Sequence, residues 1–288
     1  MKHGIYYAFW EQEWTGDYIR YIKKVSALGF DILEIAAHQI LGYTDARLAE
    51  IRACSKDNGI VLTAGIGPPK DKNLSSADES IRTAGRKFFQ DTLKQIAKLD
   101  VHTIGGALYS YWPIDYTKPV DKTGDRKRAI TEIRAMADFA ADLGITLCME
   151  VLNRFENHIL NTAAEGTAFV KEVNKENVKV MLDTFHLNIE EESIAGAIRT
   201  AGAHLGHFHT GECNRMPPGK GRMPWREIGE ALRDIHYSGA VVMEPFIKMG
   251  GTVGSDIKVW RDLSGGADEE AMDKLARDAL IFSRYMLG

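Results

Sequence analysis

Residues 128–152, RAITEIRAMADFAADLGITLCMEVL, join an amphipathic stretch directly to an apolar stretch of β-type residues. The glycine at the joint, Gly144, is typical of a helix C-cap that leads straight into the next strand. The segment therefore predicts a helix followed by a strand over 145–152. This strand carries a carboxylate, Glu150, after mostly apolar residues. An isolated buried charge loses a large hydration free energy, so Glu150 needs a partner elsewhere in the fold.

Similar apolar stretches recur along the chain, and each is followed by a segment with helical periodicity. They lie at residues 3–9, 31–37, 60–66, 101–108, 145–152, 178–184, 205–211 and 240–246. Strands that alternate with helices form parallel sheets, and eight such units predict an α/β fold, the closed (β/α)8 TIM barrel. A doubly wound open sheet is the alternative, but the chain has neither a G-x-G-x-x-G nor a G-x-x-x-x-G-K-[ST] motif. We expect one domain over residues 1–288, because no linker, repeat or low-complexity tract interrupts the pattern.

The two kinds of loop differ in length. Helix-to-strand joints are short, whereas several strand-to-helix connections are long, at residues 67–80, 109–125, 211–225 and 247–270. In a TIM barrel the latter gather at the carboxyl ends of the strands, where active sites are found. Within the first of them, Ser76 and Glu79 match a capping box, which predicts the start of the next helix.

The composition is that of an ordinary globular protein. The chain has 288 residues, of which 44% are hydrophobic and 26% charged, and its formal net charge is −4. This slightly acidic balance gives no electrostatic basis for nucleic-acid binding. The sequence has no apolar run of membrane-spanning length, no signal-peptide pattern and only three scattered cysteines. We expect a cytoplasmic protein without a nucleic-acid or membrane partner.

Four consecutive predicted strands end in side chains that bind metal ions. These are Glu150, Asp183, His209 and Glu244, separated from one another by about one strand–helix unit. Alternate side chains share a face of a strand, so all four can point into the mouth of the barrel. His207, two residues before His209, is expected to lie one layer deeper. A single strand-end carboxylate is often just capped or paired, but four ligands on adjacent strands favour a metal site.

Three converging carboxylates repel one another unless a cation lies among them. An oxygen-rich set with one nitrogen favours Mn²⁺ or Mg²⁺ over the sulfur- and nitrogen-rich sets of structural zinc. Such an ion can bind a carbonyl oxygen and the neighbouring hydroxyl, which acidifies the hydrogen on the hydroxyl-bearing carbon. Glu150 and Glu244 lie at the two ends of the four-strand arc, so one can remove this proton and the other return one to the opposite face. The same ligands also allow hydrolysis by a bound water, so they leave the reaction open.

Further polar and aromatic side chains are predicted beside this site. His186 follows Asp183 closely, and Arg215, in the loop after the seventh strand, either hydrogen-bonds a substrate oxygen or is a solvated charge. The basic residues 219–222, GKGR, are interpreted as solvated, because no glycine-rich turn of a phosphate-binding pattern accompanies them. Aromatic residues at strand ends and in long loops predict an apolar wall suited to the CH faces of a sugar. They are Tyr6, Phe9, Trp14, Tyr109, Tyr111, Trp112 and Phe246.

Five segments carry a resemblance to a known family. They are IGGALYSYWPIDY (104–116), EVLNRFENH (150–158), VMLDTFHLNIEE (180–191), GHFHTGECNR (206–215) and GGTVGSDIKVWRDLSGGAD (250–268). They resemble segments of the D-psicose (D-allulose) 3-epimerases, in the D-tagatose 3-epimerase family of xylose-isomerase-like barrels, and the likeness extends over essentially the whole chain. The resemblance implies a carbohydrate isomerase that interconverts D-fructose and D-psicose. Deprotonation and reprotonation at C3 would proceed through a cis-enediolate.

The resemblance also implies roles for individual residues. Glu150, Asp183, His209 and Glu244 would bind Mn²⁺ or Co²⁺, with Mg²⁺ less expected, and Glu150 and Glu244 would transfer the protons. Glu156, His186 and Arg215 would hydrogen-bond the ketohexose near O1 to O3.

The far end of the sugar would be surrounded by a wall of Tyr6, Trp14, Gly65, Ala107, Trp112 and Phe246. The small residues Gly65 and Ala107, together with Tyr6, are similar to the psicose-preferring branch. The family forms homodimers and homotetramers, so the resemblance implies a homo-oligomer of one of these sizes.

Other functions stay open on the sequence. A D-tagatose 3-epimerase with a broader ketohexose preference has the same ligands, and so has an aldose–ketose isomerase on the same barrel. A metal phosphodiesterase acting on damaged DNA would need more histidine ligands and a basic face, which this chain lacks. A catalytically silent sugar-binding protein is the last alternative. Glu150→Gln should leave sugar binding largely intact in either case, but only in an enzyme would it abolish turnover.

Overall fold

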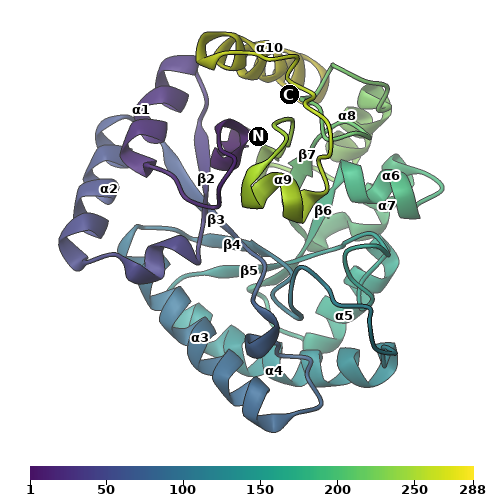
Figure 1. Ribbon diagram of the computed structural model, residues 1–288. Coiled ribbons are helices and arrows are strands. Elements are labelled where there is room, and N and C mark those ends of the chain that lie inside the picture. The colour runs from purple at the N-terminus through teal and green to yellow at the C-terminus, as the bar shows by residue number, and fades with distance from the viewer.

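Eight parallel strands close into a barrel in the computed structural model, which describes residues 1–288 (Figure 1). The strands are β1 (Lys2–Tyr6), β2 (Ile32–Ala36), β3 (Val61–Ile66), β4 (Thr103–Gly106), β5 (Thr146–Glu150), β6 (Val178–Asp183), β7 (Leu205–Thr210) and β8 (Ala240–Met243). Each strand pairs with its neighbours in sequence, and β8 pairs with β1, with Met243 opposite Ile5. The predicted (β/α)8 TIM barrel is confirmed.

Helices surround the strands and connect them (Figure 1). They are α1 (Tyr18–Leu28), α2 (Asp45–Asp57), α3 (Glu79–Lys98), α4 (Lys122–Asp142), α5 (Ala163–Val173), α6 (Thr184–Glu190), α7 (Ile194–Ala201), α8 (Trp225–Asp234), α9 (Gly251–Ile257) and α10 (Glu269–Leu287). The short α6 follows β6 directly, and α9 lies in the long connection after β8. None of these helices combines the length and the apolar character that crossing a membrane requires.

The alternation of side chains is visible at the end of β5 and in β6. A β-carbon added to Gly166 of α5 would lie 2.8 Å from Val151 Cγ2 and 3.4 Å from Val180 Cγ1. These two valines therefore face the helical layer. Glu150 and Asp183 have the opposite parity, so they face the interior of the barrel. This is the orientation that the sequence predicted.

The first strand is shorter than its apolar sequence suggests. β1 ends at Tyr6, and Tyr7–Trp10 form a short 3-10 helix with buried side chains. Phe9 and Trp10, for example, pack edge to face with ring centroids 5.1 Å apart. The predicted strand over 3–9 is therefore wrong at its end, because these residues are apolar for packing in the core and not for a place in the sheet.

The start of α3 also differs from the predicted capping box. Asp78 is the N-cap, and its Oδ1 accepts a hydrogen bond from the backbone N–H of Ser80 at 2.8 Å. Ser76 shapes the preceding turn instead, since its Oγ accepts from the backbone N–H of Asp78 at 3.1 Å. The helix therefore begins later than predicted, because the charged side chain of Asp78 takes the N-cap role that was predicted for Ser76.

Candidate active site

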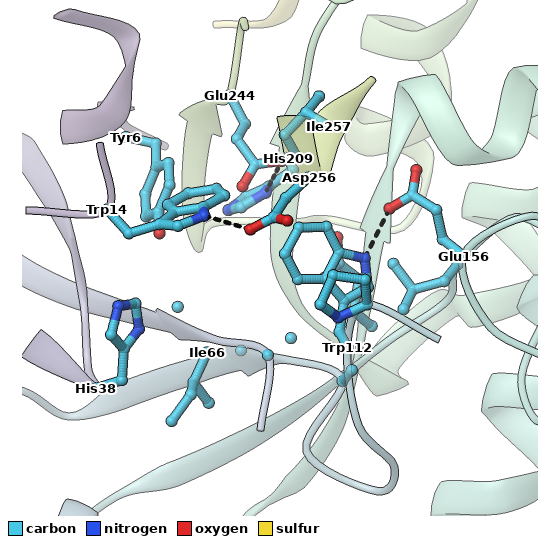
Figure 2. A pocket seen from close by; sticks show the side chains of 18 of the residues that line it. Tyr6, Trp14, His38, Ile66, Trp112, Glu156, His209, Glu244, Asp256 and Ile257 are labelled. Carbon is cyan, nitrogen blue, oxygen red and sulfur yellow. Dashed lines mark hydrogen bonds and ion pairs between the residues drawn. The ribbon is translucent and has the colours of Figure 1, made fainter. Parts of the chain in front are cut away.

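A cavity of about 430 Å³ lies at the carboxyl ends of the strands (Figure 2). All the substrate-binding residues implied by the family resemblance line it: Tyr6, Trp14, Gly65, Ala107, Trp112, Glu156, His186, Arg215 and Phe246. Three predicted metal ligands, Glu150, His209 and Glu244, line the cavity as well, and the fourth, Asp183, is fully buried. The volume is within the range of small-molecule sites.

The four predicted ligands converge at the inner end of this cavity. Glu150 and Asp183 are the last residues of β5 and β6, His209 lies in β7, and Glu244 directly follows β8. Ligand atoms of Asp183, His209 and Glu244 lie within 4.8 Å of one another, and so do those of Glu150, Asp183 and His186. Asp183 therefore connects the two groups. We call Glu150, Asp183, His209 and Glu244 the acid end of the cavity.

His209 is held by a carboxylate that was not among the predicted site residues. Glu34, in the middle of β2, is 1% exposed, and its Oε1 lies 2.6 Å from His209 Nε2. Its Oε2 lies 2.7 Å from His207 Nε2 and accepts a hydrogen bond from Thr63 Oγ1 at 2.7 Å. His207 is buried and does not line the cavity, in agreement with its predicted deeper layer. Glu34 interrupts an apolar strand just as Glu150 does, so the sequence did carry the indication.

The charges of this cluster influence one another strongly. Burial by itself raises the pKa of Glu34, but His209 and His207 outweigh it and hold that pKa well below its usual value. Burial likewise disfavours protonated His209, yet Glu34 and Glu244 raise its pKa well above the usual value. The pKa of Glu150 is also raised, first by burial and then by the charge of Glu244. The acid end therefore favours bound protons or another cation.

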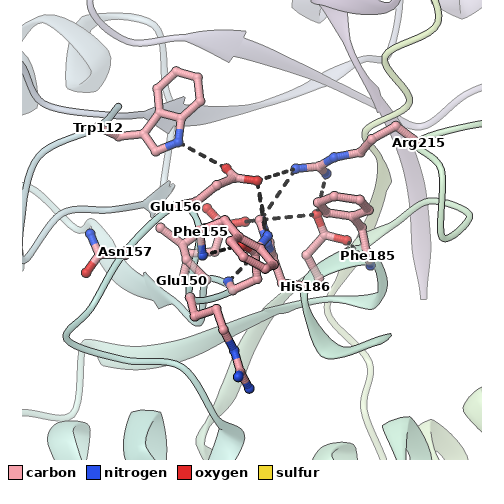
Figure 3. A network of polar contacts seen from close by, with 12 residues as sticks. Trp112, Glu150, Phe155, Glu156, Asn157, Phe185, His186 and Arg215 are labelled. Atoms are coloured by element: carbon pink, nitrogen blue, oxygen red, sulfur yellow. Dashed lines mark hydrogen bonds and ion pairs between the residues drawn. The ribbon is translucent and has the colours of Figure 1, made fainter. Parts of the chain in front are cut away.

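Arg215 supplies part of this positive charge (Figure 3). Its Nη1 donates to Asp183 Oδ2 at 2.8 Å and to Glu244 Oε2 at 3.0 Å. The guanidinium carbon lies 3.9 Å from the ring centroid of Phe185 and 5.4 Å from that of Phe246. Such cation–π contacts fix the plane of the group. Of the two interpretations of Arg215, the solvated charge is wrong, because Arg215 is only 5% exposed.

The loop that carries Arg215 is held by a second buried carboxylate. Arg215 has a φ of 63°, in the left-handed region that non-glycine residues rarely adopt. Glu212, which is fully buried, accepts hydrogen bonds from the backbone N–H of Gly219 and from Trp225 Nε1, both at 2.8 Å. These hydrogen bonds join the start of the loop to its middle and its end, which stabilises its conformation. Glu212 was not among the predicted site residues.

His186 and Glu156 belong to one polar network beside the acid end (Figure 3). Glu156 Oε2 accepts from Trp112 Nε1 at 3.0 Å, and its Oε1 accepts from Asn153 Nδ2 at 3.2 Å. Asn153 Nδ2 also lies 2.8 Å from His186 Nδ1. Burial and the charge of Arg215 lower the pKa of His186 to about 3, so this ring is neutral. Asn153, a residue absent from the predicted site, thus connects two predicted ones.

Aromatic side chains line another part of the cavity. We call Tyr6, Trp14, Trp112 and Phe246 the aromatic wall. The Trp14 ring lies 6.0 Å from those of Trp112 and Phe246, and Tyr6 lies 6.1 Å from Phe246. Trp14 Nε1 donates to Asp256 Oδ2 of α9 at 2.8 Å, which ties the connection after β8 to the loop after β1 (Figure 2). Asp256 was not predicted, because nothing in its loop sequence indicates this partner.

Three aromatic residues predicted for this wall are elsewhere. Phe9, Tyr109 and Tyr111 do not line the cavity and are buried. Phe9 packs in the core against Trp10. The hydroxyl of Tyr109 donates a hydrogen bond to the backbone carbonyl oxygen of Glu150 at 2.7 Å. Their position near strand ends and in long loops predicted that they line the cavity. In the structure these residues, which closely follow the strands, are buried in the core instead.

The acid end has the donor set of a divalent-cation site. Three carboxylates and one imidazole nitrogen suit Mn²⁺ or a similar ion. Nδ1 of His209 is buried without a hydrogen-bond partner and lies 3.6 Å from Glu244 Oε2. A buried polar atom without a partner is costly, and a cation between these two groups would satisfy it. The residues therefore fit a divalent metal.

Known proteins resemble this chain along its length. The profile of the xylose isomerase-like TIM barrel family matches residues 22–263. The D-psicose 3-epimerase of Agrobacterium fabrum is 70% identical over 288 residues, 100% of both chains. A crystal structure of a D-psicose 3-epimerase in the presence of D-fructose has a TM-score of 0.99 at 70% identity and covers 100% of both chains. The D-psicose 3-epimerase from Clostridium cellulolyticum H10 with D-tagatose has a TM-score of 0.99 at 63% identity, over 100% of this chain and 99% of that one.

Proposed function

The chain belongs to the xylose isomerase-like TIM barrel family, as an isomerase of its ketose 3-epimerase group, and we propose that it interconverts D-fructose and D-psicose with a divalent metal. The observation that carries the proposal is the pair Glu150 and Glu244, which flank Asp183 and His209 at one end of a sugar-sized cavity. Two carboxylates on either side of a bound carbon are what inversion by proton exchange requires.

The cavity orients an open-chain ketose by its two unlike ends. At the acid end, Arg215 and neutral His186 can hydrogen-bond the oxygens of C1 to C3, together with Glu156. At the other end, the aromatic wall offers ring faces to the CH groups of C4 to C6. The carbonyl end of the sugar and the CH groups of C4 to C6 therefore favour one direction of binding, with C3 between the two glutamates.

The proton transfers are assigned to Glu150 and Glu244. A bound divalent cation would polarise the ketone and the neighbouring hydroxyl, which acidifies the hydrogen on C3. One glutamate then takes this proton to leave a cis-enediolate, and the other delivers a proton to the opposite face. In the metal-free protein, burial and the charge of Glu244 raise the pKa of Glu150, and a bound cation would lower it again.

The metal itself is proposed to be Mn²⁺, with Co²⁺ as the alternative and Mg²⁺ less favoured. The three oxygens and one nitrogen of the acid end suit all three ions, but imidazole ligation favours the transition metals. Dialysis against a chelator followed by addition of each ion should identify the metal that restores the highest turnover.

Incubation of the purified protein with D-fructose and Mn²⁺ in deuterated water tests the function. We expect D-psicose with deuterium at C3, and no product after the metal is removed. Label at C1 or C2 with formation of an aldose would assign an aldose–ketose isomerase instead. Absence of any product with any ketohexose would contradict the proposal.

A D-tagatose 3-epimerase with a broader preference is the second candidate. The relative solved with D-tagatose favours it, because that chain is 63% identical to this one. Values of kcat/KM for D-fructose, D-psicose and D-tagatose, measured side by side, separate the two. A higher value for D-tagatose than for D-psicose would overturn the psicose preference that Gly65 and Ala107 suggest.

A further inference from the structure

Glu34 is an unusual residue for the interior of this barrel. It stands in the middle of β2, is 1% exposed and does not line the cavity. Its carboxylate has three side-chain partners on two other strands: Thr63 of β3 and both His207 and His209 of β7. A buried charge is expensive compared with an apolar side chain of similar size. A role beyond packing would explain why this strand contains a glutamate.

The hydrogen bonds of Glu34 determine which nitrogen of His209 carries a proton. An ionised carboxylate only accepts hydrogen bonds, so the 2.6 Å contact with Oε1 requires a proton on Nε2 of His209. In the neutral ring, Nδ1 is then the atom with a free lone pair. That atom is buried without a hydrogen-bond partner and faces Glu244 Oε2 at 3.6 Å. The geometry therefore directs the lone pair of His209 towards the acid end.

We propose that Glu34 is the positioning residue of the metal site, which fixes the ring orientation and the Nε2-protonated tautomer of His209 so that Nδ1 binds the metal. The proposal rests on the ligand role of His209 in the proposed function. A carboxylate behind a histidine ligand also increases the basicity of the ring, and loss of such a partner typically weakens metal binding about 10- to 100-fold.

The other two partners hold the carboxylate in place. His207 Nε2 and Thr63 Oγ1 both lie 2.7 Å from Oε2, which leaves Oε1 for His209. The ligand atoms of Glu34, His207 and His209 lie close enough to bind a second cation. However, both oxygens of Glu34 are already engaged in short hydrogen bonds inside a closed cluster. The proposal therefore requires one metal ion per chain.

Calorimetric titration of the metal-free protein with Mn²⁺ tests this role independently of any sugar. We expect one site per chain, with a dissociation constant about 10- to 100-fold higher in Glu34→Gln, because an amide cannot accept from both histidines and has no charge. Thr63→Val is the matched control, since it removes one hydrogen bond to Oε2 and leaves both histidine contacts, and it should change the constant only a few-fold. Equal affinity of Glu34→Gln and wild type, or two ions per chain, would overturn the proposal.

Wild-type protein provides a measurement that does not depend on the folding of a variant. With ¹⁵N-histidine labelling and diamagnetic Mg²⁺, the ring of His209 should have its proton on Nε2 and none on Nδ1, assigned by the loss of its signals in His209→Gln. A proton on Nδ1 would contradict the role of Glu34. Weaker Mn²⁺ binding in Glu34→Gln without epimerisation by the wild type would refute the proposed reaction and leave the positioning role intact.

Discussion

The acid end and the aromatic wall of the cavity are built in different ways. The acid end consists of residues at the ends of β5 to β8, and buried partners such as Glu34 and Arg215 hold it through contacts of 3.0 Å or less. The aromatic wall depends on loops, and Trp14 reaches its partner Asp256 from the opposite end of the chain. In the proposed function, chemistry thus depends on the rigid sheet, whereas contact with the rest of the substrate depends on loops, which vary more easily. Changes at the acid end should therefore reduce turnover, and changes at the wall should mainly alter affinity.

The largest effect is expected from Glu150→Gln. The amide keeps the size of the side chain but can neither take nor deliver a proton, so kcat with D-fructose should fall about 10²- to 10⁴-fold or more. Steady-state kinetics at saturating Mn²⁺ measures it. Glu176→Gln, an exposed carboxylate at a helix-to-strand joint, is the control and should leave kcat unchanged. A kcat within tenfold of wild type would show that Glu150 does not transfer the proton.

A smaller but still large effect is expected from pH on Mn²⁺ affinity. The pKa values of Glu150 and His209 are raised in the folded, metal-free protein, so it holds protons that the unfolded chain releases at lower pH. These protons stabilise the metal-free fold at low pH, and their contribution is lost as the pH rises through the raised pKa values. The metal has to displace them, so its affinity should increase with pH by about tenfold per unit for each proton released.

Titration calorimetry at several pH values between about 5.5 and 8 measures this dependence. Glu150→Gln removes one of the two titrating groups and should give a shallower increase. An affinity that stays constant over this range in the wild type would contradict the coupled charges of the acid end.

The same contrast explains what the sequence could predict. Glu150 and Asp183 were found because strand alternation and the repeat of the barrel determine where a strand-end side chain points. Glu34 is also a carboxylate in an apolar strand, but it lies in the middle of β2. It therefore does not belong to the series of strand-end ligands that the barrel repeat predicts. Its role depends on a contact between β2 and β7, which are separated by β1 and β8 in the barrel and share no sequence pattern.

The aromatic wall was only partly predictable for a related reason. Trp14 and Phe246 do line the cavity, whereas Phe9 and Tyr109 pack in the core, although all four are aromatic residues near strand ends. Loop conformation decides between the two outcomes, and no periodicity records it. The predictions for the wall therefore needed the family resemblance, which the acid end did not.

At the border between the two regions, Arg215→Lys should have an intermediate effect. A lysine cannot contact Asp183 and Glu244 while stacking on Phe185, so charge-assisted hydrogen bonds are lost although the charge remains. We expect kcat/KM for D-fructose to fall about 10- to 100-fold. Arg222→Lys, an exposed arginine in the same loop, provides the control. An unchanged kcat/KM would mean that a point charge is sufficient at this position.

The smallest effect should come from Trp14→Phe at the aromatic wall. Phenylalanine keeps an aromatic face for the sugar but loses the 2.8 Å hydrogen bond from Nε1 to Asp256, so the two loops hold the far end less firmly. One hydrogen bond of this kind corresponds to about a 2- to 10-fold increase in KM for D-fructose, with kcat nearly unchanged. Asp256→Asn retains an acceptor oxygen for the indole and should increase KM less. If Trp14→Phe instead lowered kcat as strongly as Arg215→Lys, the loops would take part in positioning C3, and the division of the cavity into a chemical end and a binding end would be wrong.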